Sequence, residues 1–420
     1  MSMQFSKVSG LISAILLIVV GMFAQQRYGV VGKYIPAPNQ EELDNARTYS
    51  AFSELINADV PSERKDVDFQ TFWEVWGLLE RDYIEADEID AQTMVDGAIS
   101  GLASSLGDPY TIYLPPVDNE RSAQDLAGAF YGVGIELGYV DGVLAAVSPL
   151  SGSPAESAGI LPQDLIVHVA DPDKDLDEDT NGWTLPEAVE NIRGPKGSNV
   201  TLTVIREGAT EPLEIDVTRD EIIVESVEVE MVEHAGKRVA HISLSRFGER
   251  TSEEWDKVVA NILAEGSEID GIVLDMRNNP GGFFDGAIDI ASDFIEDGTV
   301  VSQVGKFSSK DYEAVGNARL KDIPTVILVN KGSASASEIV AGALRDDLGT
   351  KIIGTNTFGK GTVQDRRELS NGGGIHITVS KWLLPGGSWI HDEGIPVDVE
   401  VEQDFETETD EQLHKAIETL

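Results

Sequence analysis

Short apolar segments alternate with amphipathic segments through residues 221–401. Buried strands are predicted at Val239–Leu244, Gly271–Met276, Thr325–Val329 and Lys351–Ile353. Helices are predicted between them, at Ser252–Glu265, Phe283–Phe294 and Ser337–Asp346. Strands that alternate with helices are typical of a fold with a parallel sheet, so we expect residues 221–401 to form an α/β core.

Apolar and polar residues alternate with a period of two in residues 125–220, which predicts a β-rich unit. Strands are predicted at Gly134–Tyr139, Val143–Val147, Leu165–Val169, Val200–Arg206 and Leu213–Thr218, with a helix at Thr184–Ile192. An acidic insertion, residues 171–179, interrupts this unit. Leu176 stands where an EF-hand loop starting at Asp171 needs glycine, so we expect a solvated acidic loop rather than a calcium site.

Apolar residues recur at helical spacing through residues 67–106, in the N-terminal helical region that we place at 67–124. One helix face carries a stripe that we expect to pack as core, made of Phe69, Phe72, Trp73, Trp76 and Leu79. Gly107-Asp108-Pro109 then ends the helical pattern. The polar, proline-containing residues 34–66 read as a tether, and residues 402–420 as an acidic stretch followed by a short helix.

The N-terminal segment, residues 1–33, contains an apolar stretch without charge from Val8 to Ala24. Its length lies between that of a signal-peptide core and that of a short membrane helix. Met22 stands where a cleavage site needs a small residue, which favours an uncleaved anchor over a cleaved signal. Both interpretations place the rest of the chain outside the cytoplasm, and we expect a periplasmic protein anchored to the inner membrane.

Charge and cysteine content exclude several kinds of protein. The 420 residues include 31 Lys and Arg against 74 Asp and Glu, a net charge of −43. Phosphate backbones repel such a chain, so we expect no nucleic-acid partner. Because the chain contains no cysteine, disulfides, thiolate zinc sites, iron–sulfur clusters and a thiol nucleophile are excluded. The acidic residues are spread along the chain and indicate solubility rather than a binding site.

The first candidate for chemistry is the segment after the strand Thr325–Val329. Small residues there, Gly332 to Ser337, lead into a predicted helix, a place where α/β folds hold ligands and nucleophiles. N–H groups of a first helical turn can stabilise an oxyanion. Alternatively, Ser335 only caps the helix, with Glu338 completing a capping box.

A second candidate is Lys360, which stands between two glycines. In an extended segment Lys360, Thr362 and Gln364 share one face. Burial disfavours the charged form of a lysine, so Lys360 could serve as a base; alternatively it is a surface lysine in a turn. The chain's six histidines stand in no recognisable catalytic context.

A third candidate is the segment from Asp275 to Gly282, again a strand that runs into a loop and a helix. Paired glycines can aim N–H groups inward. The segment lacks the Gly-Lys-Ser/Thr ending of a phosphate-binding P-loop.

Together these segments resemble the carboxyl-terminal processing peptidases, Ser–Lys proteases with an inserted PDZ domain. The resemblance runs in order through residues 67–415 and includes GDPYTIYL (107–114), YGVGIEL (131–137), RGPKGSNVTLTVIREG (193–208), DMRNNPGG (275–282), KGSASASEIVAGAL (331–344), FGKGTVQ (358–364) and GIPVDVEV (394–401). It implies an α/β peptidase core of the ClpP/crotonase type at 221–401, a PDZ domain at 125–220 and an N-terminal helical region at 67–124.

The resemblance also implies residue roles. The 25-residue spacing from 335 to 360 is that of the family, which selects Ser335 as nucleophile and Lys360 as general base, with Gln364 orienting the base. Oxyanion-hole N–H groups are implied at Gly281 and Ala336. The carboxylate-binding loop of the PDZ domain is implied at Gly132, Val133, Gly134 and Ile135.

We therefore expect a serine endopeptidase of the cell envelope that cleaves proteins near their C-termini. Its partners are protein or peptide substrates with free, apolar C-termini, and a homo-oligomer or an adaptor is compatible with the sequence. No metal ion or organic cofactor is implied. The alternatives are a catalytically inactive PDZ scaffold, against which the intact Ser335, Lys360 and Gln364 argue, and a Ser–His hydrolase of different specificity.

Overall fold

The computed structural model describes residues 68–403, 407 and 409–420. By its contacts the chain divides into a first unit that ends at Ile89 and a second unit, Asp90–Leu420. The apolar stretch of residues 8–24 and the tether of residues 34–66 lie outside the described residues. From residue 68 onward, the described helices are too short or too polar to cross a membrane.

In the first unit the structure describes the helix α3 (Gln70–Asp82) and the short 3₁₀ helix η2 (Ala86–Glu88). The rings of Phe72 and Trp73 meet edge to face with centroids 5.0 Å apart. Trp76 is buried, whereas Phe69 and Leu79 are 46% and 44% exposed. The prediction that the whole stripe packs as core is therefore wrong at both ends of the helix.

The centre of the second unit is a six-stranded sheet in the order β10-β11-β12-β15-β16-β19. Its strands are β10 (Val227–His234), β11 (Lys237–Leu244), β12 (Gly271–Asp275), β15 (Thr325–Val329), β16 (Lys351–Gly354) and β19 (Val399–Glu400). All neighbours pair in parallel except β10 and β11. The predicted parallel core is confirmed, and β12 is buried along its whole length, as a strand covered on both faces should be.

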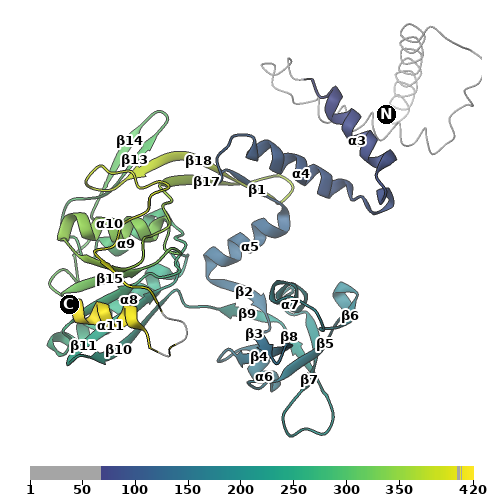
Figure 1. Cartoon of the computed structure of the whole chain (residues 1–420), viewed down its shortest axis with the longest axis horizontal. Coiled ribbons are helices and arrows are strands. Elements are labelled where there is room, and N and C mark those ends of the chain that lie inside the picture. Colours follow the sequence, from purple (N-terminus) through teal and green to yellow (C-terminus); the bar gives the residue numbers. More distant parts are fainter. Residues whose placement is uncertain (1–67, 404–406, 408) are drawn as a thin grey trace, which may run out of the picture. The chain divides into compact units, whose positions relative to one another are not determined.

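Helices cover both faces of this sheet (Figure 1). One core joins the sheet to α8 (Thr251–Glu265), α9 (Phe284–Ala291) and α10 (Ala336–Leu348). A second core joins the opposite face to the C-terminal helix α11 (Glu411–Thr419). The 3₁₀ helix η4 (Gly266–Glu268) follows α8. Because helices pack on both faces of the sheet, β12 and β15 are fixed in place. The loops that follow their carboxyl ends lie at the edge of the sheet, where α/β folds bind ligands.

A second, antiparallel sheet is organised around the long strand β18 (Gly374–Leu383). Three strands pair with β18: β1 (Ile112–Leu114), β13 (Thr299–Gly305) and β17 (Thr362–Glu368). The strand β14 (Ser309–Glu313) pairs with β13. The helix α4 (Ala91–Ser104) precedes β1, so the predicted end of the helical pattern at residues 107–109 is confirmed. The helix α5 (Pro116–Ala127) follows β1.

The β-rich unit begins and ends in a strand pair, β2 (Ala129–Gly132) with β9 (Asp220–Ile223). Its main sheet has the order β3-β4-β5-β7-β8. These strands are β3 (Ile135–Val140), β4 (Val143–Pro149), β5 (Leu165–Asp171), β7 (Asn199–Ile205) and β8 (Leu213–Thr218), with helices α6 (Pro154–Ala158) and α7 (Leu185–Ile192). The predicted strands and the predicted helix are all present, and β3 forms one edge of the sheet.

The acidic insertion is more ordered than expected. Residues Pro172–Lys174 form the 3₁₀ helix η3, and Leu176–Asp179 form β6, which pairs with β5. The Asp171 carboxylate lies 2.6 Å from the Arg219 guanidinium, and both side chains are buried. Residues 172–175 and 177–179 are exposed, so the predicted solvated stretch is confirmed for them. Asp171 is the exception, because it is buried and anchors the insertion inside the domain through a residue 48 positions away.

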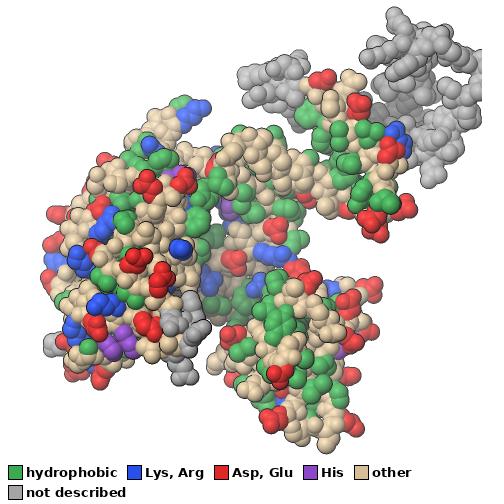
Figure 2. All heavy atoms as spheres, viewed as in Figure 1, with side chains coloured by type: hydrophobic (Ala, Val, Ile, Leu, Met, Phe, Trp, Pro, Cys, Tyr) green, Lys and Arg blue, Asp and Glu red, His purple; other side chains and the backbone are tan. Residues whose placement is uncertain are grey.

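Acidic side chains are dispersed over the surface of the described residues. Figure 2 shows them scattered over both the α/β core and the β-rich unit on the face drawn. A charge excess distributed in this way keeps like-charged molecules apart in solution, and it does not build a site for one cation.

Candidate active site

The loop after β15 carries three serines, and packing distinguishes them. Ser333 is fully buried and its hydroxyl donates to Met276 O (2.7 Å). Ser337 is fully buried as well and donates to Asn279 O (3.0 Å). Ser335 lines a cleft of about 960 Å³ and has φ = 55°, a left-handed conformation that is costly for a residue other than glycine. The fold thus turns Ser335 toward the cleft and uses the other two hydroxyls as structural donors.

Glu338 joins the start of α10 to the segment before β17. Its fully buried carboxylate accepts the N–H of Ser335 (2.8 Å), which is the carboxylate half of the capping box expected from the sequence. The same carboxylate accepts the Thr357 hydroxyl (2.6 Å) and the N–H groups of Gly359 (2.7 Å) and Lys360 (2.9 Å). Sequence reasoning assigned Glu338 to the helix cap alone and missed its second set of donors.

Lys360 lies in the same cleft as Ser335, with its Nζ 5.2 Å from the centre of the Tyr110 ring. Its backbone oxygen accepts the indole N–H of Trp382 (3.0 Å), which fixes the start of β17 against β18. Burial lowers the pKa of Lys360, while the carboxylates of Glu338 and Asp108 oppose that change. A lysine in this environment loses its proton more easily than a surface lysine.

Gln364 is held by two threonine hydroxyls. Its Nε2 donates to Thr362 Oγ1 (3.0 Å) and to Thr378 Oγ1 (3.1 Å), so Thr362 and Gln364 share one face, as predicted. Ser335, Lys360 and Gln364 all line the one cleft. Among the described residues, however, no hydrogen bond joins Lys360 Nζ to Ser335 or to Gln364.

Gly281 and Ala336, the predicted oxyanion donors, meet beside the nucleophile. A Cβ on Gly281 would lie 2.8 Å from Ser335 Cβ and 3.0 Å from Ala336 N, so only glycine fits there. The Ala336 N–H is the first of α10 and has no acceptor within its own helix. The Gly281 N–H, by contrast, donates to Asn279 Oδ1 (2.9 Å). The two amides are therefore adjacent, but only that of Ala336 is open in this structure.

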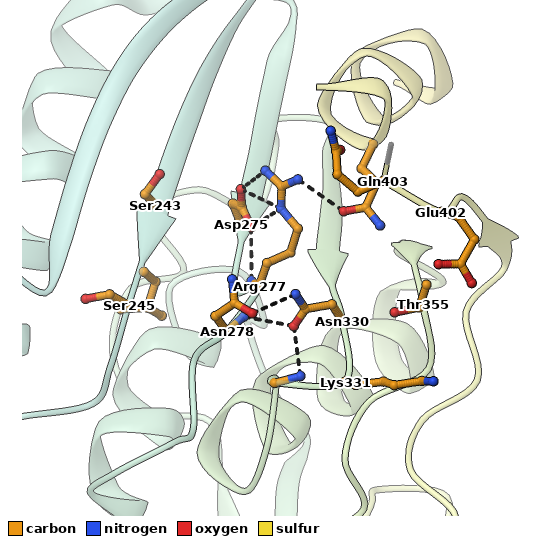
Figure 3. Close-up of a pocket in the computed structure, with 13 residues that line it drawn as sticks. Ser243, Ser245, Asp275, Arg277, Asn278, Asn330, Lys331, Thr355, Glu402 and Gln403 are labelled. Carbon is orange, nitrogen blue, oxygen red and sulfur yellow. Dashed lines mark hydrogen bonds and ion pairs between the residues drawn. The ribbon is translucent and has the colours of Figure 1, made fainter. Parts of the chain in front are cut away.

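The two loops that carry these amides are tied together by Asn278 and Asn330. The N–H of Asn278 donates to Asn330 Oδ1, and Asn330 Nδ2 donates to Asn278 Oδ1, both at 2.9 Å. Figure 3 shows this pair at a second cavity, of about 460 Å³. The pair sets the spacing between the loop after β12 and the loop after β15.

Arg277, which also lines that cavity, anchors the loop after β12 to the C-terminal helix. Its guanidinium donates to Asp275 (2.6 Å), as Figure 3 shows. It also donates to Asp410 (2.8 Å) and to Gln412 (3.1 Å). Burial would raise the pKa of Asp275, but hydrogen bonds from His241 and Arg277 lower it, so the carboxylate stays ionised. Sequence reasoning missed this clamp, because α11 lies far along the chain.

Two histidines near the cleft also escaped sequence reasoning. His376 lines it with a buried Nε2 that has no hydrogen-bond partner among the described residues, and burial lowers its pKa. His391 Nδ1 accepts the N–H of Gly361 (3.3 Å). Neither ring is hydrogen-bonded to Ser335. Within the described part of the chain, no group of three or more His, Asp and Glu side chains is placed to hold a metal ion.

The segment Gly132–Ile135 forms the turn into the edge strand β3. The N–H groups of Val133 and Gly134 donate to no other described residue. Gly134 has φ = 75°, and a Cβ there would lie 2.4 Å from Ser153 Cβ. The Val133 side chain is buried in the core of the unit, and that of Ile135 is partly buried against the same core.

Comparisons with known proteins agree with this architecture. The family "Peptidase family S41" matches residues 238–401, and "Activating protease CtpB N-terminal domain" matches residues 28–118. Carboxy-terminal processing protease CtpB of Bacillus subtilis (strain 168) is 34% identical over 378 residues, 90% of this chain and 75% of that protein. Carboxy-terminal processing protease CtpA of the same organism is 36% identical over 338 residues, 80% of this chain and 70% of that protein.

Solved structures add a shared fold. The crystal structure of an S41 protease from Bacteroides fragilis NCTC 9343 aligns with a TM-score of 0.53 at 16% identity, covering 82% of this chain and 96% of that one. At this identity the alignment shows the fold alone. The level of identity to CtpB and CtpA, over most of both chains, shows the family. The chain therefore belongs to the carboxy-terminal processing proteases of peptidase family S41, which are serine peptidases.

Proposed function

We propose that this serine peptidase works with a Ser335–Lys360 dyad, supported by Gln364. The observation that carries the proposal is that one buried carboxylate, Glu338, binds the backbone of both Ser335 and Lys360. Both side chains line the same cleft, and the pKa of Lys360 is lowered by burial. A lysine with a lowered pKa is a competent general base, because a neutral amine can accept a proton.

The reaction follows from these positions. Ser335 Oγ attacks the carbonyl carbon of the scissile bond while neutral Lys360 takes the hydroxyl proton. The N–H of Ala336, and that of Gly281 once Asn279 releases it, stabilise the oxyanion. Breakdown transfers the proton from Lys360 to the leaving amine and leaves an ester on Ser335. Water then attacks the ester, Lys360 accepts a proton from that water, and Ser335 recovers its hydroxyl as the peptide acid departs.

We also propose that the β-rich unit is a PDZ domain inserted into a core of the ClpP/crotonase type. The open N–H groups of Val133 and Gly134 are suited to a substrate's terminal carboxylate. The edge strand β3 that follows, with α7 in contact beside it, is suited to pairing with an extended peptide. The substrates are then proteins with free, apolar C-termini, cleaved near that end.

The location that we propose is the cell envelope, outside the cytoplasm. It rests on the apolar stretch of residues 8–24, which we interpret as an inner-membrane anchor. Fractionation of cells and protease treatment of intact spheroplasts test the location. The chain should be found with the membranes and should be digested by the added protease. Protection from the protease would place it in the cytoplasm.

A covalent serine probe followed by peptide mapping tests the dyad. The probe should label Ser335 in the wild type, and neither Ser335→Ala nor Lys360→Arg should cleave an unstructured protein substrate, because a guanidinium stays protonated. Substantial cleavage by Lys360→Arg removes Lys360 from the mechanism. Failure of the wild type to label or cleave favours the inactive scaffold, and labelling that depends on a histidine favours a Ser–His hydrolase.

A further inference from the structure

The segment Gly107–Leu114 (GDPYTIYL) has no part in the reaction above, yet the fold brings it to the dyad. β1 pairs antiparallel with β18 and places Ile112 opposite His376, a residue of the cleft. Gly107, with φ = 72°, turns the chain between α4 and β1. As a result the ring of Tyr110 stands beside Lys360, although more than two hundred residues separate them along the sequence.

Asp108 holds its own turn and reaches β18. Its carboxylate accepts the N–H of Tyr110 (3.0 Å) and the hydroxyl of Thr111 (2.6 Å). Thr111 Oγ1 in turn accepts the N–H of Thr378 (3.1 Å). Burial would raise the pKa of Asp108, but hydrogen bonds from the hydroxyls of Thr111 and Thr378 lower it below its ordinary value. Asp108 is therefore an ionised carboxylate, which can only accept hydrogen bonds.

Thr111 and Thr378 connect Asp108 to Gln364. The Thr111 hydroxyl that donates to Asp108 also accepts the N–H of Thr378, and the Thr378 hydroxyl accepts Nε2 of Gln364. Thr362 Oγ1 accepts the same Nε2. With its nitrogen held in this way, the Gln364 amide keeps its Oε1 as the remaining acceptor, the group that a lysine ammonium needs.

Tyr110 meets Lys360 from the other side. The Lys360 Nζ lies over the face of the Tyr110 ring, where a cation is attracted by the negative face of the π system. The charge of Asp108 acts on Lys360 in the same direction. Lys360 becomes an ammonium when it takes the proton of Ser335, so both groups favour the charge that forms in the acylation step.

We infer that Asp108 and Tyr110 are positioning residues of the Ser335–Lys360 dyad, an inference that rests on the proposed function. Asp108 holds the Gln364 amide in place through Thr111 and Thr378. Asp108 and the Tyr110 ring together stabilise the ammonium form of Lys360 that acylation creates. The segment 107–114 is thus a third part of the active site, beside the loop of Ser335 and the strand that carries Gln364.

Other charged groups also face Lys360 and must be held constant in a test. They are Glu338 from α10 and His376 from β18. Behind Tyr110 lie His391 and Asp392, from the segment after Trp389. None of these groups is altered in an Asp108 variant. A change in the pH dependence of such a variant is therefore assigned to the charge of Asp108.

The test measures kcat and KM against pH for cleavage of an unstructured protein substrate by the full chain. Asp108→Asn should lower kcat about tenfold or more. It should also shift the limb on which activity rises with pH toward lower pH, because removal of a nearby negative charge lowers the pKa of Lys360. Asp322→Asn, which changes an exposed charge elsewhere, is the matched control and should do neither.

A second set of variants tests the Thr378 hydroxyl separately from the turn that Asp108 holds. Thr378→Val removes the hydroxyl and leaves the backbone N–H that Thr111 accepts, so kcat should fall about tenfold with KM little changed. Thr378→Ser restores the hydroxyl and should restore kcat. Tyr110→Phe keeps the ring and should behave like the wild type, whereas Tyr110→Leu should lose activity. These variants decide the question even if Asp108→Asn folds poorly.

The outcomes distinguish this inference from the proposed function beneath it. If Ser335→Ala is inactive while Asp108→Asn and Thr378→Val match the wild type in kcat and in pH dependence, the inference is overturned and the dyad stands. An equal loss of kcat in Thr378→Val and Thr378→Ser also overturns it, because serine supplies the same hydroxyl to Gln364 as threonine does. If Ser335→Ala still cleaves the substrate, both the proposed dyad and this inference are contradicted.

Discussion

The backbone N–H groups of Ser335 and Lys360 donate to the same oxygen, Oε2 of Glu338, at 2.8 and 2.9 Å. The other oxygen accepts the Thr357 hydroxyl and the Gly359 N–H. A helix cap and the alignment of the proposed dyad are therefore one structural feature. The two residues come from separate elements, and this carboxylate holds both of their backbones.

Replacement of that carboxylate should cost both stability and activity. In Glu338→Gln the amide nitrogen would face donors that it cannot accept from, so we expect a loss of about 1–3 kcal/mol in the free energy of unfolding. We also expect kcat to fall by a factor of ten or more, since Ser335 and Lys360 are no longer aligned. Urea unfolding and turnover measure the two effects. Glu253→Gln, on the exposed face of α8, should change neither, and a wild-type kcat in Glu338→Gln contradicts the alignment role.

The pH dependence should follow the deprotonation of Lys360. Burial lowers its pKa, and Lys360 acts as a base only when neutral, so kcat/KM should rise with pH through a midpoint below that of an exposed lysine. Below this midpoint the enzyme loses activity without unfolding. Circular dichroism over the same pH range distinguishes loss of activity from unfolding. A flat profile from acidic to alkaline pH, at constant fold, would exclude Lys360 as the group that titrates.

Sequence patterns predicted the parts of the fold that depend on local periodicity. The strands β11, β12, β15 and β16 and the helices between them lie where apolar spacing places them. The resemblance to the processing peptidases implied the roles of Ser335, Lys360 and Gln364, and the structure brings all three to one cleft. Contacts between distant segments leave no periodic trace. Periodicity therefore did not indicate the Asp171–Arg219 pair or the approach of Tyr110 to Lys360.

The Asn278–Asn330 pair should matter for turnover more than for substrate binding. It joins the two loops that supply Gly281 and Ala336, so Asn330→Ala should loosen the oxyanion hole. We expect kcat to fall about tenfold, with KM nearly unchanged. The neighbouring exposed Lys331→Ala is the control. An increase in KM alone would show that the pair shapes the substrate cleft instead.

The buried pair Asp171–Arg219 should dominate the stability of the β-rich unit. Removal of one partner leaves an uncompensated buried charge, so Arg219→Met should cost about 3–5 kcal/mol of unfolding free energy. The double variant Asp171→Leu/Arg219→Met should recover much of that loss. Lys257→Met breaks an exposed pair with Glu253 and should cost at most about 1 kcal/mol. Equal thermal shifts in the buried and exposed variants would contradict the assignment.

Selection of substrates by their C-terminus can be tested at Gly134. In the wild type, a substrate with a free, apolar terminus should be cleaved roughly tenfold faster than its amidated version, because amidation removes the charge-assisted hydrogen bonds of the carboxylate to the N–H groups. The Asp-ended version keeps that carboxylate and should be cleaved more slowly because its charged side chain replaces an apolar one. Equal rates for all three substrates would leave the β-rich unit without a role in choosing them.

Gly134→Ala should abolish that preference, and Gly142→Ala should not. Both glycines have positive φ, so both variants carry the same kind of backbone strain. A Cβ at Gly134 would lie 2.4 Å from Ser153 Cβ and must displace the turn, whereas a Cβ at Gly142 meets nothing within 4 Å. The difference between the two variants therefore isolates the displacement of the Val133 and Gly134 N–H groups. In Gly134→Ala the free-terminus rate should fall to the amidated rate, with the amidated rate itself unchanged. If Gly134→Ala keeps the full preference, the terminal carboxylate is bound elsewhere in the protein.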